Sequence, residues 1–158
     1  MRAGVLAAGL MLGGCSITAS NPISPAPGRI HVSSPAYGAG AAIPSRFTCQ
    51  GPDVSPPLTW SGVPRAAREL ELVMRDADAP GGNFIHWQLT GIPSSTRTLA
   101  VGQTPPEAKS GRNSFGSVGY RGPCPPPGPS HHYLITVSAR SGAAVLATGA
   151  LTGTYARR

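Results

Sequence analysis

Residues 69–92, with the sequence ELELVMRDADAPGGNFIHWQLTGI, decide the fold of this chain. The first eight, Glu69–Asp76, alternate between apolar and polar side chains, a period of two typical of a strand with one buried face. The Pro-Gly-Gly of a turn follows, and a second strand-like run occupies 83–92. In that run we expect Trp87 on the apolar face and His86 on the opposite face. The stretch therefore predicts two strands joined by a turn.

The turn between these strands concentrates polar chemistry. Residues 76–86 (DADAPGGNFIH) contain two carboxylates, Asp76 and Asp78, and the imidazole of His86. Alone, Asp-x-Asp-x-Pro is common in surface turns, because Asp caps backbone amides and Pro ends strand pairing. A second polar cluster, GYRGPCPPPG followed by two histidines and a tyrosine, occupies 119–133. We expect the two clusters to converge on one small anion-binding pocket.

The rest of the chain predicts a loop-rich β domain. Residues 29–34 alternate weakly as a strand, and 43–60 read as two strands around a Gly-Pro-Asp turn. Residues 93–119 are mostly turns, and 131–139 form a further strand. The Ala/Leu/Val-rich segment 142–155 predicts a short C-terminal helix.

Length and charge limit the class of protein. With 158 residues the chain is long enough for one domain. Its formal charge is +7, from 13 basic residues against 6 acidic ones. These cations are scattered and form no basic run with interleaved aromatics, so we expect no nucleic-acid partner. Their charge favours anionic headgroups.

The first residues have the composition of a secretion signal. Arg2 precedes an apolar stretch over 5–12, which is too short to span a bilayer. The sequence LGGC at 12–15 follows and resembles the lipobox of bacterial lipoproteins.

This resemblance implies that the signal peptide, 1–14, is removed. Cys15 then carries a diacylglyceryl thioether and an acyl chain such as palmitate, which together anchor a protein stably. The Ser/Pro-rich segment 15–28 reads as a tether. We therefore expect a lipoprotein of the bacterial cell envelope, anchored on the extracytoplasmic side of a membrane that the sequence does not identify.

Nine short motifs follow one another along residues 32–155. They are 48–51 (TCQG), 55–60 (SPPLTW), 76–80 (DADAP), 86–87 (HW), 92–93 (IP), 111–116 (GRNSFG), 119–128 (GYRGPCPPPG), 131–133 (HHY) and 151–155 (LTGTY). Together they resemble the phosphatidylethanolamine-binding protein family, and most closely its bacterial Raf-kinase-inhibitor-like branch.

The family resemblance implies a mainly β fold, an antiparallel, Greek-key-like β-sandwich over residues 29–158, with a small pocket at one edge. It implies that the pocket binds phosphate-like or carboxylate anions, including phospholipid headgroups such as phosphatidylethanolamine, with no cofactor. The ligand-binding residues that it implies are Asp76, Asp78, Pro80, His86, Gly122, Pro123, His131 and Tyr133.

The hydrogen-bond donors among these residues suit an oxyanion. Imidazole N–H groups, the Tyr133 hydroxyl and the Gly122 amide are donors. An ionised Asp76 cannot contact an anion directly, so its expected role is to hold a neighbouring imidazole in its donating form.

The chain departs from the family pattern at two places. Ala77 stands where the family usually has Pro, and the chain is shorter by roughly twenty residues near 138–143. The second departure predicts that an element flanking the pocket is missing.

Two cysteines, Cys49 and Cys124, remain after lipidation. In an oxidising envelope they can form a disulfide, and the alternative is two separate buried thiols.

Three classes of function are compatible with these residues. The leading one is non-catalytic binding of an anion or headgroup, since the sequence lacks G-x-S-x-G, H-E-x-x-H, C-x-x-C and Walker motifs. The second is an inhibitory module that acts on a protein partner. The third is a metal-dependent hydrolase using Asp76, His86 and His131, although we expect neither metal nor enzyme activity.

Overall fold

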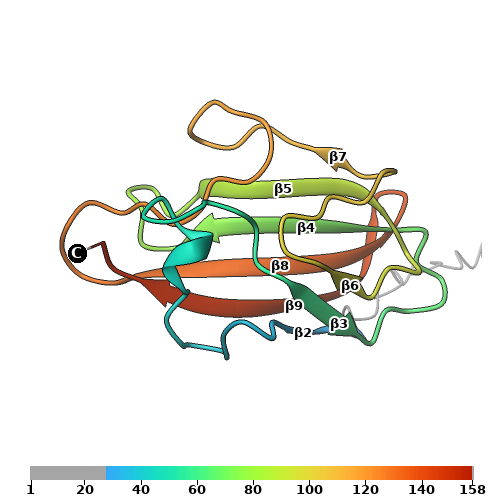
Figure 1. The fold of residues 1–158 in the computed structure, drawn as a ribbon. Helices are drawn as coiled ribbons and strands as arrows, with labels where there is room; N and C mark the ends of the chain where they lie inside the picture. Colours follow the sequence, from blue (N-terminus) through green and yellow to red (C-terminus); the bar gives the residue numbers. More distant parts are fainter. Residues whose placement is uncertain (1–27, 158) are drawn as a thin grey trace, which may run out of the picture.

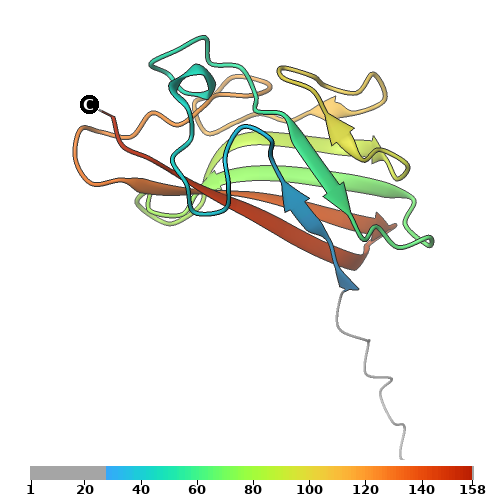
Figure 2. The ribbon, with the colours of Figure 1, turned by 60° about the horizontal axis from the view of Figure 1, so that its bottom comes forward.

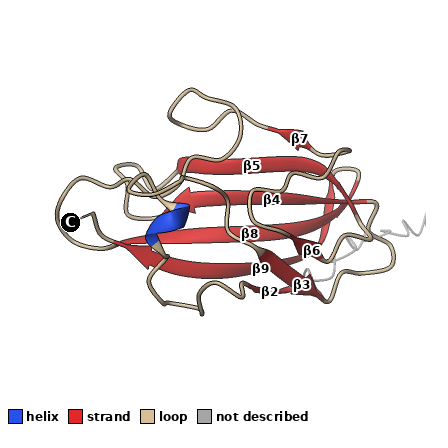
Figure 3. Cartoon of the chain, viewed as in Figure 1, coloured by secondary structure: helices blue, strands red, loops and turns tan. Residues whose placement is uncertain are grey.

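The computed structural model describes residues 28–157, and these form two layered β-sheets (Figures 1 and 3). The larger sheet has the strand order β1-β9-β8-β4-β5-β7, and the smaller has the order β2-β3-β6. The elements are β1 (Gly28–Arg29), β2 (His31–Ser33), the 3-10 helix η1 (Ser45–Phe47), β3 (Leu58–Ser61), β4 (Glu69–Asp76), β5 (Phe84–Pro93), β6 (Thr98–Leu99), β7 (Lys109–Ser110), β8 (His131–Ser141) and β9 (Ala144–Tyr155).

The expected mainly β sandwich is confirmed. Along β4, the side chains of Leu70, Leu72 and Met74 are fully buried, as the alternation predicts. They belong to one hydrophobic core with Leu58, Trp60 and Leu99 of the smaller sheet, which crosses over the larger one in Figure 2. Burial of such side chains supplies most of the free energy that holds two β layers together. All pairings among the named strands are antiparallel except that of β1 with β9, so the larger sheet is mixed.

A β-bulge in β5 changes the predicted position of His86. Met74 pairs with Trp87 and the next residue, Arg75, pairs with Ile85, so the pairing skips His86. His86 and Trp87 are consequently both buried, although they are consecutive. The prediction of strict alternation, with His86 on a less buried face, was wrong at this point. Bulges commonly redirect a side chain next to a site.

The predicted C-terminal helix is wrong, because residues 144–155 form the long strand β9. This strand pairs with β8 from Ala144 to Tyr155. Its threonines are β-branched and favour strands, and Gly149 and Gly153 let other backbone and side chains approach closely. Pairing with β8 therefore outweighs the helix propensity of its Ala and Leu residues.

We expect Gly149→Ala to lower the free energy of unfolding by about 3 kcal/mol. A Cβ at Gly149 would lie 1.8 Å from the carbonyl oxygen of Ile30, so the backbone of the β1–β2 segment would have to move. Urea denaturation measures the change. Gly38→Ala is the matched control, because a Cβ there meets nothing within 4 Å. Equal stability of the two variants would contradict the prediction.

The N-terminal half differs from expectation in two further places. Residues 43–60 contain η1 and a single strand, β3, where two strands were predicted. The predicted strand over 29–34 is divided between the two sheets, as β1 and β2. The predicted signal peptide 1–14, the lipidation site Cys15 and all but the last residue of the tether 15–28 lie outside the described residues. In the part of the chain that the structure describes, no helix has the length and apolar character needed to cross a membrane.

Candidate functional site

A cavity of about 140 Å³ lies at the end of the larger sheet where β4 ends and where β5 and β8 begin. This end of the sheet is at the left in Figure 1. Residues of both polar clusters, which the sequence predicted to converge, line this cavity. The lining residues are Asp76, Ala79, Pro80, Phe84, His86, Phe115, Cys124, Pro125, Pro126 and His131.

Three larger cavities, of about 480, 470 and 250 Å³, lie elsewhere in the described residues. The first runs along the edge formed by β1 and β9, the second lies beside Ile43 and Tyr155, and the third lies between β2 and β3. None of them brings a carboxylate and an imidazole together, so the smallest cavity is the candidate site.

Asp76 organises the floor of the candidate site. The whole residue is almost fully buried, at 4% exposure. Oδ1 accepts hydrogen bonds from the backbone N–H groups of Asp78 (2.9 Å) and Ala79 (3.1 Å), which closes the turn after β4. Oδ2 lies 2.7 Å from Nδ1 of His131 on β8. A carboxylate only accepts, so Nδ1 of His131 carries the hydrogen and the Nε2 atom remains for the cavity.

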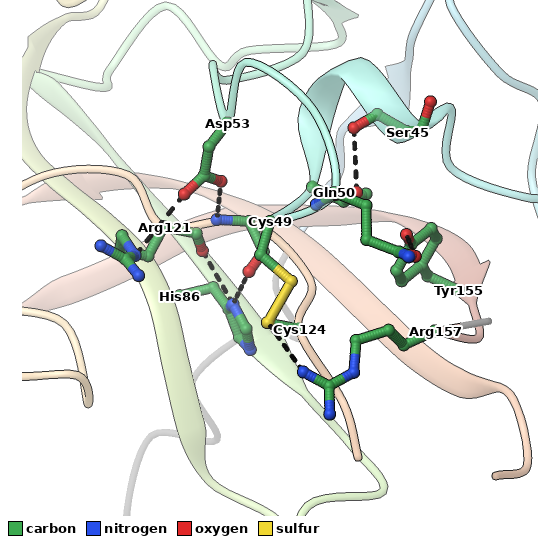
Figure 4. Close-up of a disulfide and its surroundings, with 11 residues drawn as sticks. Ser45, Cys49, Gln50, Asp53, His86, Arg121, Cys124, Tyr155 and Arg157 are labelled. Atoms are coloured by element: carbon green, nitrogen blue, oxygen red, sulfur yellow. Dashed lines mark hydrogen bonds and ion pairs between the residues drawn. A yellow bond between two sulfur atoms is a disulfide. The ribbon is translucent and has the colours of Figure 1, made fainter. Parts of the chain in front are cut away.

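His86 is held in a similar way by backbone carbonyls. Its Nδ1 lies 2.8 Å from the carbonyl oxygen of Arg121 and 3.1 Å from that of Gly122 (Figure 4). Both are acceptors, so Nδ1–H is the donor and neutral His86 has a bare Nε2. Burial lowers the pKa of His86, and the carbonyl contacts and the charge of Asp76 oppose this shift only in part.

Aromatic rings and a disulfide complete the wall. Phe115 meets the rings of Phe84 and His86 edge-on, at centroid distances of 4.9 and 5.3 Å. On the other side, Cys124 is joined to Cys49 in a disulfide with a Cα–Cα distance of 5.4 Å (Figure 4). The site is therefore a cavity with largely apolar walls, and two imidazoles and one carboxylate also line it.

Four of the residues implied by the resemblance lie outside the lining. Tyr133 is fully buried, and its ring packs edge-on against His86 at 5.2 Å. Its hydroxyl makes no well-formed hydrogen bond, and burial together with the nearby charge of Asp76 raises the pKa of that hydroxyl. Tyr133 thus packs against the rings of His86 and His131 from outside the cavity lining.

The other three have partners within the protein. The Gly122 amide, expected to donate to the ligand, donates to Asp53 at 2.7 Å. The Pro123 carbonyl accepts from the N–H of Cys49 at 3.2 Å. Asp78 is exposed and bonds His132, whose side-chain hydrogen bond is the main reason that the pKa of Asp78 is lowered.

The sequence reasoning assigned no role to several residues at this site. Phe84 and Phe115 form the apolar wall, and Arg121 lies 5.3 Å from the Phe115 ring centroid. Asp53 holds the loop behind His86. One signal was available, because Phe115 and Asp53 lie within or beside the motifs that carry the family resemblance.

The metal triad considered for Asp76, His86 and His131 has no geometric support. Among residues 28–157, no group of three or more His, Cys, Asp and Glu side chains is arranged to hold a metal ion. Both oxygens of Asp76 already accept N–H groups from the protein.

Comparison with known proteins supports the family resemblance that the nine motifs indicated. The family model described as phosphatidylethanolamine-binding protein matches residues 33–157. The chain belongs to this family. Two crystal structures resemble it, each with a TM-score of 0.75 and 31% identity over 82% of this chain and 99% of theirs. They are a candidate phosphatidylethanolamine-binding protein homologue, CT736 from Chlamydia trachomatis, and YbcL from E. coli, a member of the mammalian family.

Curated relatives give a similar result. LppC from Mycobacterium tuberculosis, named as a candidate lipoprotein, is 46% identical over 77% of this chain and 60% of its own length. A UPF0098 protein from Aquifex aeolicus is 44% identical over 71% of this chain and 68% of its own length. The chain thus spans about 60% of the length of LppC. Neither name describes a catalytic activity.

Proposed function

We propose that this member of the phosphatidylethanolamine-binding protein family is an envelope lipoprotein that binds a small anion or a phospholipid headgroup without transforming it. The observation that carries the proposal is the cavity of about 140 Å³ in which His86 and His131 meet apolar walls. A water molecule occupies roughly 30 Å³ in the liquid, so the cavity suits a phosphate group and not a whole lipid.

The polar groups of the cavity are arranged to hold an anion. Both oxygens of Asp76 accept hydrogen bonds from protein N–H groups, so its carboxylate is not free to act as a general base. In both imidazoles Nδ1 is bonded to the protein, which leaves two Nε2 atoms, and each can donate to an anion once it carries a proton.

The lipoprotein part of the proposal rests on the LGGC sequence at 12–15 and on the name of LppC. The described chain begins at β1, which pairs with Ala147 and Thr148 of β9, whereas His131 beside the cavity pairs with Tyr155. Eight residues of strand separate these points, about 26 Å at 3.3 Å per residue. The cavity thus lies at the end of the sheet remote from the proposed tether.

We expect His86→Ala to abolish measurable binding of phosphate and phosphoethanolamine. The substitution removes an Nε2 atom from the cavity and leaves the Arg121 and Gly122 carbonyls without their donor. Calorimetric titration of the protein with Cys15→Ser measures the effect. His31→Ala is the control, because His31 is an exposed residue on β2. Absence of binding by the folded parent, or full binding by His86→Ala, would contradict the proposal.

One observation favours an interaction module as the second candidate. Phe115 and Val118, in the loop between β7 and β8, are 41% and 64% exposed. Exposed apolar side chains beside a pocket can contact a protein partner. In that case Val118→Ser would weaken partner binding, whereas His86→Ala would not.

A further inference from the structure

Asp53 lies outside the candidate site but contacts the loop that holds His86 (Figure 4). Its Oδ1 accepts the Gly122 N–H at 2.7 Å, and its Oδ2 lies 3.5 Å from Nε of Arg121. The carbonyls of these same two loop residues accept the Nδ1–H of His86. A chain of contacts therefore runs from Asp53 through one peptide group to the imidazole.

The backbone at Asp53 indicates that this contact is built into the fold. Asp53 has φ of +57°, the single positive φ among the non-glycine residues that the structure describes. Such a conformation is disfavoured for most side chains and is tolerated best by Asn and Asp. Asp53, the residue with this disfavoured conformation, is also the residue whose carboxylate accepts the Gly122 N–H.

The orientation of His86 has a chemical consequence for an anion. A neutral imidazole that donates through Nδ1 presents a lone pair at Nε2. A fully ionised oxyanion oxygen would face that lone pair with no hydrogen between them. A stable contact requires one proton, either on Nε2 or on the ligand oxygen.

We propose that Asp53 is a positioning residue that keeps the bare Nε2 of His86 available to the cavity, so that an oxyanion binds together with one proton. This inference rests on the proposed function and adds to it the protonation state of the complex. The proton comes from water, or from the ligand when the ligand is itself an acid, and no covalent bond to carbon or phosphorus changes.

The surroundings of His86 favour a neutral imidazole in the free protein and uptake of a proton when an anion binds. Its ring lies against Phe84, Phe115 and Tyr133. None of these three side chains supplies the negative charge with which a carboxylate in contact would stabilise an imidazolium. An anion in the cavity supplies the missing negative charge. The ionisable groups around His86 are Asp76 from β4, His131 and Tyr133 from β8, and Asp53 and Arg121 from two loops.

The sign of the pH dependence follows from these pKa directions. Burial lowers the pKa of His86 in the free protein, and a bound anion raises it. Between the two pKa values, binding takes up one proton, so the affinity falls about tenfold for each unit by which the pH rises. Below the free pKa the affinity no longer depends on this group.

Glycerophosphoethanolamine is the probe for the first measurement, because its phosphodiester does not titrate near neutral pH. Calorimetry at one pH in two buffers of different ionisation enthalpy counts the protons taken up. We expect about one proton per bound ligand at pH 7.5. Binding without proton uptake would overturn this inference and leave the proposed function standing, whereas failure of every anion to bind would overturn the proposed function.

The ¹⁵N chemical shifts of the histidines test the role of Asp53 with or without ligand. We expect the Nδ1–H tautomer of His86 in the free protein. In Asp53→Gly, which accepts the positive φ but lacks the acceptor, we expect both tautomers and a weaker pH dependence of binding. Asp53→Asn keeps an oxygen in place and should restore the single tautomer.

Glu107→Gln is the control for loss of one negative charge, since Glu107 is exposed beside Gly91, near the opposite end of β5 from His86. If Asp53→Gly lowers stability but leaves the tautomer and the pH dependence unchanged, Asp53 has only a structural role and the inference is wrong. A proton found on His131 instead of His86 would also overturn it.

Discussion

Replacing Cys49 and Cys124 by serine should lower the free energy of unfolding by about 4 kcal/mol, as the chain-entropy model gives for a loop of this length. The disulfide links residues 75 positions apart. Its loss restores to the unfolded chain the conformational freedom that the bridge removes.

The folded state has other contacts at the same place. The hydroxyl of Tyr120 donates to the Phe47 carbonyl at 2.6 Å, and the N–H of Cys49 donates to the Pro123 carbonyl at 3.2 Å. These contacts should keep the double variant folded at 25 °C. Because Cys124 lines the cavity, we also expect weaker anion binding.

Urea denaturation of the double variant and of the chemically reduced parent should give the same midpoint. The parent in its oxidised form is the reference. A difference in stability below about 1 kcal/mol would show that the bridge constrains the unfolded chain far less than the chain-entropy model predicts.

The second large effect is expected at Asp76. Asp76→Ala leaves three buried or half-buried donors without their acceptor, namely the N–H groups of Asp78 and Ala79 and the Nδ1–H of His131. An unsatisfied buried donor costs roughly 1–3 kcal/mol. We expect a loss of about 3–5 kcal/mol in stability and, since His131 loses its orientation, loss of anion binding.

Asp78→Ala is the matched control for stability. Asp78 is an exposed carboxylate whose partner, His132, is also exposed, and contacts of that kind contribute little to stability because solvent screens them. Asp76→Asn should lie between parent and Asp76→Ala, because one amide oxygen can still accept from either the turn or His131. Similar losses in Asp76→Ala and Asp78→Ala would contradict the assigned role of Asp76.

Much of the larger sheet could be predicted from the sequence, because alternation is a local property. The buried face of β4, with Leu72 at its centre, and the shared face of Tyr133, Ile135 and Val137 on β8 follow directly from a period of two. The order of the motifs indicated the family, and the chemistry of Asp76, His86 and His131 led to the expectation of an anion pocket, which stays a prediction.

Other features depended on contacts between residues far apart in the chain. The strand β9 replaced a predicted helix because β8 offered it a partner along its whole length. The burial of His86 required a register shift against β4. The Gly122 amide was expected to donate to a ligand, but Asp53, 69 residues away, accepts it.

By itself, the sequence determined the mainly β class, the family and part of the pocket lining, namely Asp76, Pro80, His86 and His131, since local period and motif chemistry carry that information. The tertiary structure decided which atoms face the pocket. Strand register, a bulge and the competition for each N–H group are settled only when segments distant in the chain meet, and these contacts engage Nδ1 of His86 and of His131, the two histidines that line the cavity.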